Sequence, residues 1–126
     1  MASSLHQEVR ELLKQIYPEG LIQEERTIKY GGRTLRLDFF IGYPFNVAVE
    51  CQGEQHDKYV PHFHRDQEGF RESLRRDRLK DTWCYEQAVA LVYVYAHESG
   101  LTVDDLRKKI EKAEREVDRE WDYDDE

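Results

Sequence analysis

The chain has 126 residues, of which 39% are hydrophobic and 37% are charged, and its net charge is −8 at pH 7. This length predicts a single domain that buries roughly two thirds of the surface exposed by the unfolded chain. The negative charge argues against a protein that simply coats nucleic acid, although the arginines gathered between residues 65 and 80 provide local positive charge.

Two further features limit the class of protein. The longest apolar run, residues 88–96, is too short to cross a bilayer, so we expect no membrane partner. Cys51 and Cys84 fall in segments that are predicted to be buried. We therefore expect reduced thiols and a cytoplasmic protein rather than a disulfide framework.

The hydrophobic pattern predicts seven elements. Apolar residues at helical spacing follow Ser3 or Ser4 and stop before Pro18, which indicates a first helix. Gly31-Gly32 predicts a hairpin turn. In chain order, we expect a helix over 4–16, strands over 26–30, 34–41 and 46–52, a helix over 67–87, a strand over 88–95 buried on both faces, and a helix from residue 103.

The order αβββαβα, without repeats or linkers, predicts an α/β domain in which helices flank a mixed sheet. We place this domain at residues 1–119. The last residues, 120–126, are acidic and are expected to form a frayed tail.

Two acids fall on strands where charge is costly. In the second strand we expect Leu35, Leu37, Phe39 and Ile41 on one face and Arg36, Asp38 and Phe40 on the other. In the third strand Val47, Val49 and Cys51 face away from Ala48, Glu50 and Gln52. Asp38, Glu50 and the Cys51 carbonyl would then suit Mg²⁺, which prefers oxygen ligands. The alternative is that Asp38 pairs with Arg36 or Lys29 on a solvated face.

Asp77 falls at helical spacing within the apolar stripe of the predicted helix over residues 67–87. The stripe consists of Phe70, Leu74, Cys84 and Ala88, and it also includes Asp81. Because an unpaired buried carboxylate is costly, a positive group must lie opposite Asp77. That group is a metal, a protonated His56, or Lys80 or an arginine in a structural pair.

The polar segment after the third strand carries three histidines. His56 lies just beyond the acid pair and could accept or donate a proton near neutral pH. Lys58, His62 and His64 are expected to contact phosphate, as are Arg75 and Arg76. An alternative is a zinc site, because Cys51, His56, His62 and His64 have the ligand types that zinc binds.

These residues resemble the PD-(D/E)xK nuclease superfamily, whose core has the same order of helices and strands. The closer resemblance is to very-short-patch repair endonucleases and phage homing-type endonucleases with an EDxHD active site. Three phrases carry it, in order: Leu35-Arg36-Leu37-Asp38-Phe39-Phe40-Ile41, Glu50-Cys51-Gln52-Gly53-Glu54-Gln55-His56 and Arg76-Asp77-Arg78-Leu79-Lys80.

The resemblance implies a restriction-endonuclease-like fold and a DNA endonuclease that uses Mg²⁺ or Mn²⁺. Asp38 and Glu50 would be its acids, and Gln52 would stand at the usual lysine position, where His56 or Lys80 could substitute. Glu8 best matches the glutamate of the family's first helix, with Glu24 and Glu25 as alternatives.

The resemblance also leaves a second reading open. Because Gln52 replaces the lysine, the chain could be a catalytically inactive DNA-binding or regulatory protein of the same fold. We expect no attached DNA-recognition domain, so specificity would come from the core itself or a partner protein. Cutting both strands would suggest a homodimer.

Overall fold

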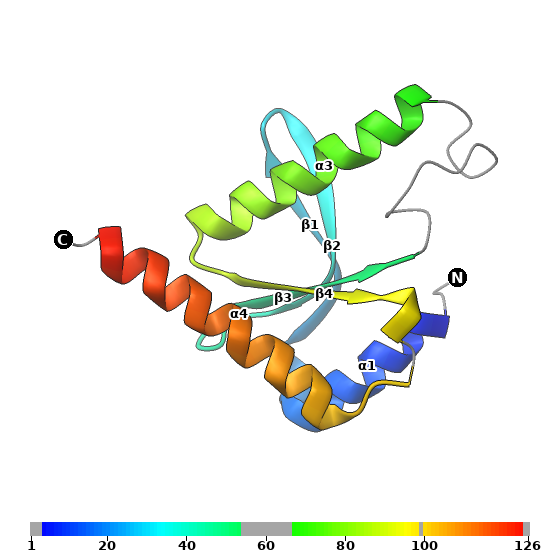
Figure 1. The fold of residues 1–126 in the computed structure, drawn as a ribbon, viewed down its shortest axis with the longest axis vertical. Coiled ribbons are helices and arrows are strands. Elements are labelled where there is room, and N and C mark those ends of the chain that lie inside the picture. The colour runs from blue at the N-terminus through cyan, green and yellow to red at the C-terminus, as the bar shows by residue number, and fades with distance from the viewer. Residues whose placement is uncertain (1–3, 54–66, 99, 125–126) are drawn as a thin grey trace.

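The computed structural model describes residues 4–53, 67–98 and 100–124, with side chains up to residue 120. Within these described residues there are a four-stranded sheet and three α-helices (Figure 1). In chain order the elements are α1 (Ser4–Ile16), the 3-10 helix η1 (Glu19–Leu21), β1 (Ile22–Tyr30), β2 (Arg33–Ile41), β3 (Val47–Gln52), α3 (Gln67–Glu86), β4 (Ala90–Tyr95), the 3-10 helix η3 (Ala96–Glu98) and α4 (Val103–Asp124).

The sheet is mixed and its strands lie in the order β1-β2-β3-β4. The first three strands are antiparallel neighbours, whereas β4 runs parallel to β3. Helix α3 lies between β3 and β4 in the chain and covers one face of the sheet, while α1 and α4 cover the other (Figure 1). The predicted α/β class and mixed sheet are therefore confirmed, and each element lies within a few residues of its expected place.

Two apolar clusters hold the layers together. The larger lies between the sheet and the helices α1 and α4, and the smaller lies between the sheet and α3. Aliphatic side chains at alternate positions of β3 and β4 supply the centre of the larger cluster, as the two-residue period of a strand requires. Its members from these two strands are Val47, Val49, Ala90, Val92 and Val94.

The prediction that β4 is buried on both faces is wrong. Its side chains alternate between buried and half-buried along the strand. The reason is position, because β4 is the edge strand and has no neighbour beyond it in the described sheet. Leu91, Tyr93 and Tyr95 face the α3 side and are covered only in part.

The prediction that Leu35, Leu37, Phe39 and Ile41 share one face of β2 is also wrong. Phe39 and Ile41 pack in the cluster with α1, whereas Leu35 and Leu37 pack in the cluster with α3. The side chains change face at Asp38. The register places Glu25 opposite Asp38, and Glu25 has a φ of 53°, in the left-handed region. We infer that this local break in the regular strand turns the outer half of the hairpin toward α3.

The apolar stripe predicted for α3 contacts the sheet along only part of the helix. Cys84 is buried and Leu79 and Trp83 pack beside it, but Leu74 is 38% exposed. Figure 1 shows the N-terminal half of α3 rising away from β3 and β4, toward the level of the turn between β1 and β2. Leu79 of α3 packs against the hairpin turn between β1 and β2. A Cβ atom added to Gly31 in this turn would lie only 3.2 Å from the Leu79 side chain.

Helix α4 is longer than expected. It runs from Val103 to Asp124, so the expected boundary between residues 119 and 120 lies inside the helix. Its apolar residues repeat at helical spacing, with Leu106 and Ile110 buried and Ala113 and Val117 half-buried against the same cluster. That repeat extends the helix past the point where its composition becomes polar. None of the helices in the described residues is long and apolar enough to cross a membrane.

The two leucines on different helices test this account of the core. Leu106 is fully buried, so Leu106→Ala should lower the free energy of unfolding by about 2–5 kcal/mol through lost burial and a cavity. Leu74→Ala should change it by less than about 1 kcal/mol, because Leu74 is exposed. Urea unfolding measures both, and equal losses would contradict the assigned core.

Candidate functional site

The site is built where the ladder between β2 and β3 stops. Backbone pairing runs from Ile41 with Val47 to Phe39 with Val49, so the next facing residues are Asp38 and Glu50. At this step, hydrogen bonds between backbone N–H groups and side-chain carboxylates take the place of the backbone-to-backbone hydrogen bonds. The Asp38 N–H donates to Glu50 Oε2 at 2.7 Å, and the Cys51 N–H donates to Asp38 Oδ2 at 2.7 Å. The two carboxylates are thus fixed by each other's strands and lie next to one another.

Lys80 brings a positive charge to the pair from α3. Its Nζ lies 2.7 Å from Glu50 Oε1, and the side chains of Lys80 and Glu50 are only 18% and 3% exposed. Each Glu50 oxygen therefore has a hydrogen-bond donor, which buried charges require. Lys80 was one expected partner for Asp77, and the structure instead pairs it with Glu50.

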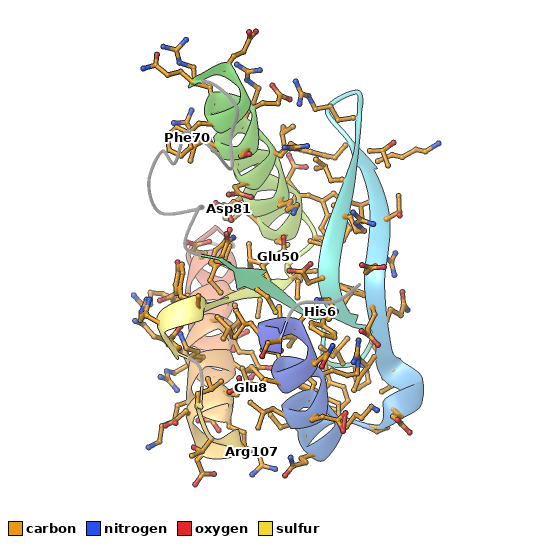
Figure 2. All side chains as sticks on the ribbon, turned by 90° about the vertical axis from the view of Figure 1, so that its right-hand side faces the viewer. His6, Glu8, Glu50, Phe70, Asp81 and Arg107 are labelled. Atoms are coloured by element: carbon orange, nitrogen blue, oxygen red, sulfur yellow. The ribbon has the colours of Figure 1, made fainter. Side chains whose placement is uncertain are left out.

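A polar pocket of about 330 Å³ opens on the α3 side of the acids. Figure 2 shows Glu50 between the sheet and α3, where this pocket lies. β2, β3 and α3 all contribute to its wall, and the lining residues are Thr34, Leu35, Arg36, Asp38, Glu50, Cys51, Gln52, Ser73, Arg76, Asp77 and Lys80. Six of these eleven residues have acidic or basic side chains, which are rare in an apolar core.

Gln52 contributes an unusual group to this pocket. Its side chain is on the same face of β3 as Glu50, as predicted, and the residue is 5% exposed. Its Oε1 atom is buried, and none of the described residues hydrogen-bonds to it. An unpaired buried oxygen is costly, so the pocket contains an acceptor that could bind a cation or donor.

Burial and the neighbouring charge of Asp38 raise the pKa of Glu50 to about 7, despite the opposing effect of Lys80. One lysine therefore does not fully compensate two adjacent carboxylates in this environment. A divalent cation near the pair would compensate them further.

Of the other predicted residues on α3, Asp77 and Arg76 line the pocket. Asp77 lines it and is half-buried, rather than fully buried as its helical phase suggested. Arg76 also lines it and is exposed. Arg75 is exposed and pairs with Glu72 at 2.5 Å. Asp81 accepts a hydrogen bond from the Tyr93 hydroxyl, which ties α3 to β4.

Four predicted residues lie outside the residues that the structure describes: His56, Lys58, His62 and His64. The proposed proton-transfer role of His56, and the three histidines of the alternative zinc site, therefore stay predictions. The alternative for Asp38, an exposed pair with Arg36 or Lys29, does not occur among the described residues. Asp38 is half-buried and accepts the Cys51 N–H instead.

The match of Glu8 to the helix glutamate stays a prediction. Glu8 accepts a hydrogen bond from the Gly100 N–H, ahead of α4 (Figure 2). His6 is the α1 residue that lies next to Asp38. Residues two apart on a helix point in very different directions, so only one of them can face the strand end. Of the alternatives, Glu24 contacts His6 at 3.1 Å and Glu25 is exposed.

His6 was missed, although its signal was present in the sequence. It precedes Val9 by three residues and Leu13 by seven, so it shares their helical face, and all three are buried. This is the same reasoning that singled out Asp77. A polar residue in the apolar stripe of a helix is a candidate for a site.

Comparisons with known proteins show no established activity. No family model matches the chain, and no solved structure matches it. The chain is 38% identical over 66 residues to "Uncharacterized protein 307L" of Invertebrate iridescent virus 6. The match covers 52% of this chain and 33% of the viral protein, so the chain spans about a third of the length of that relative.

The raised pKa of Glu50 predicts a pH-dependent stability in the presence of a chelator. An ordinary glutamate has a pKa of 4.5, and folding raises the pKa of Glu50 to about 7. The folded state then binds the proton more tightly, so the contribution is complete below pH 4.5 and is lost as the pH rises through 7. The loss should be up to about 3 kcal/mol. Urea unfolding between pH 5 and 8 should show it in the parent protein and not in Glu50→Gln, and parallel curves would refute it.

Proposed function

We propose that this chain is a metal-dependent DNA endonuclease that hydrolyses phosphodiester bonds. The observation that carries the proposal is the Asp38–Glu50 pair, in which each carboxylate is held by a backbone N–H from the other's strand, with Lys80 on Glu50. Two adjacent acids and a lysine beside a polar pocket are the groups that metal-assisted hydrolysis of a phosphodiester uses.

The arrangement of the chain supports the resemblance to the PD-(D/E)xK superfamily. Among the described residues the element order is helix, three strands, helix, strand and helix, which is compatible with such a core. The two acids come from neighbouring antiparallel strands at matched positions. The short phrases around Asp38, Glu50 and Asp77, which lie far apart in the sequence, border one pocket.

The donors of the pocket fit Mg²⁺ or Mn²⁺. The carboxylates of Asp38 and Glu50, the unpaired Oε1 of Gln52 and the carbonyl of Cys51 are all oxygen ligands, the type that hard cations select. When bound, such a cation polarises a phosphate oxygen and lowers the pKa of a coordinated water.

Other residues of the chain would orient the DNA. Lys80 provides an ammonium group beside Glu50, so it can replace the lysine that is missing at Gln52 and approach the scissile phosphate. Arg36 and Arg76 are exposed on the wall of the pocket, where they can contact flanking phosphates. His56 remains the proposed general base or acid, with Asp77 orienting it.

A second candidate is a DNA-binding or regulatory protein of the same fold without catalysis. Two observations favour it: Gln52 replaces the lysine, and both oxygens of Glu50 already accept hydrogen bonds within the protein. If the Lys80–Glu50 pair is purely structural, the pocket would contact DNA without activating water.

Cleavage assays test the proposal directly. Plasmid and branched DNA are incubated with the protein in Mg²⁺, Mn²⁺ or EDTA. Metal-dependent cutting should fall at least about 100-fold in Asp38→Asn, because a carboxylate ligand is lost. Asp104→Asn is the matched control, since the Asp104 side chain is 81% exposed. DNA binding without cutting of any substrate would favour the second candidate, and cutting that survives Asp38→Asn would refute the site.

Gln52 provides a test that needs no DNA. Gln52→Met keeps the side-chain size and removes the unpaired oxygen, so unfolding free energy in EDTA should change by less than about 1–2 kcal/mol. The stabilisation by Mg²⁺ should shrink, because a ligand is lost. Thermal shifts with and without Mg²⁺ measure both effects, with Gln15→Met, at an exposed position, as the control. An unchanged shift with Mg²⁺ would exclude Gln52 as a ligand.

A further inference from the structure

We propose that His6, Asp38 and Cys51 form a second cation site, suited to Zn²⁺ or a similar transition metal. His6 is on α1, and the side chain of Cys51 packs in the cluster on the α1 side of the sheet. Asp38 and Cys51 also line the polar pocket, so the two sites share these residues. The second cation site does not depend on the proposed nuclease activity, because the three donors could bind a metal in a protein that cuts no DNA.

The three residues come from three elements that meet at the end of the sheet. His6 is on α1, Asp38 is on β2 and Cys51 is on β3. One nitrogen of His6, one carboxylate oxygen of Asp38 and the sulfur of Cys51 all lie within 4.8 Å of one another. Zinc bonds of about 2.0–2.3 Å in tetrahedral geometry place ligand atoms about 3.5 Å apart. The side chains therefore need to close by about an ångström around the ion.

The chemistry of the donors separates this site from the oxygen-lined pocket. A thiolate and an imidazole are ligands for zinc, cobalt and related ions, whereas Mg²⁺ prefers oxygen. Three protein ligands leave the fourth zinc position for water or another ligand, as in catalytic rather than structural zinc sites. His6 is 7% exposed and Cys51 is half-buried, so the ion would be largely shielded from solvent.

Groups around His6 hold its ring in place. Glu24 Oε1 lies 3.1 Å from His6 Nε2, and Arg10 donates to both oxygens of Glu24 at 2.9 and 3.0 Å. The hydrogen bond from Arg10 lowers the pKa of Glu24, which keeps its carboxylate charged. The ring also packs on Phe39, with 4.4 Å between ring centres. Carboxylates commonly orient the histidines that bind metals.

Other roles for the thiol fit less well. Cys84 packs against the α3 side of the sheet and Cys51 against the opposite cluster, so the two cannot join in a disulfide without rearrangement. A cation bound by the thiolate uses the same three side chains without a further reactant.

Cobalt titration tests the site without reference to cleavage. The full chain, reduced and without a histidine tag, is titrated with Co²⁺, and the thiolate-to-cobalt charge-transfer absorption is recorded. We expect one equivalent of Co²⁺ to give this band and Zn²⁺ to remove it. Cys51→Ala should abolish the band. His6→Gln should weaken Co²⁺ binding at least 10-fold, and Glu24→Gln should weaken it by about 10- to 100-fold.

Two matched variants identify the thiol and the histidine. Cys84→Ala removes the other cysteine and His97→Gln removes an exposed histidine, and both should keep the band. No band in the parent protein, or a band that depends on Cys84, would overturn the proposal. A band that needs Cys51 but is unchanged in His6→Gln would also overturn it, and would support a zinc site formed with the histidines of residues 56–64. If Cys51→Ala does not fold, the His6→Gln and Glu24→Gln affinities decide.

The outcome is separable from that of the nuclease proposal. Cobalt binding without metal-dependent DNA cutting would support this site and contradict the proposed function. DNA cutting without the thiolate band would do the opposite.

Discussion

A carboxylate on a buried strand needs a donor for each oxygen, and at Glu50 the need is met by Lys80 and by the backbone N–H of Asp38. Much of the site follows from this constraint. The N–H of Asp38 is available because regular pairing of β2 with β3 ends one step earlier. Asp38 in turn accepts a hydrogen bond from the N–H of Cys51. Each carboxylate therefore bonds to a backbone N–H of the other strand that the β2–β3 ladder does not use. Lys80 comes from α3, which packs on the face of the sheet that carries Glu50.

The break in β2 has consequences for both sides of the sheet. Because the side chains change face at Asp38, the inner half of the strand packs toward α1 and α4, whereas Leu35 and Leu37 pack toward α3. The outer hairpin thereby supplies a wall of the pocket. In an unbroken strand all four apolar side chains would face α1, and the wall of the pocket would be polar. These four are Leu35, Leu37, Phe39 and Ile41. Glu25, in the left-handed conformation opposite Asp38, lies where the change occurs.

Much of this architecture could be predicted from the sequence because it depends on local periodicity. The order of elements follows from apolar spacing, and the shared face of Glu50 and Gln52 follows from the two-residue period of β3. The face change at Asp38 could not be predicted, since it depends on the backbone of Glu25 in a different strand. Glu8 was chosen by resemblance to a family, whereas His6 has the buried helical phase.

Asp38 lies between two chemically different environments. Toward α3 are the carboxylate of Glu50, the amide of Gln52 and the ammonium of Lys80, and toward α1 are an imidazole and a thiol. Only a residue at the end of a ladder can have this position, because within the sheet each side chain points to one face. A cation bound on the α1 side would withdraw charge from Asp38 and so weaken its pull on a cation in the pocket. If both sites bind metal, their occupancies must therefore be coupled through this one carboxylate, and the coupling must act equally in both directions.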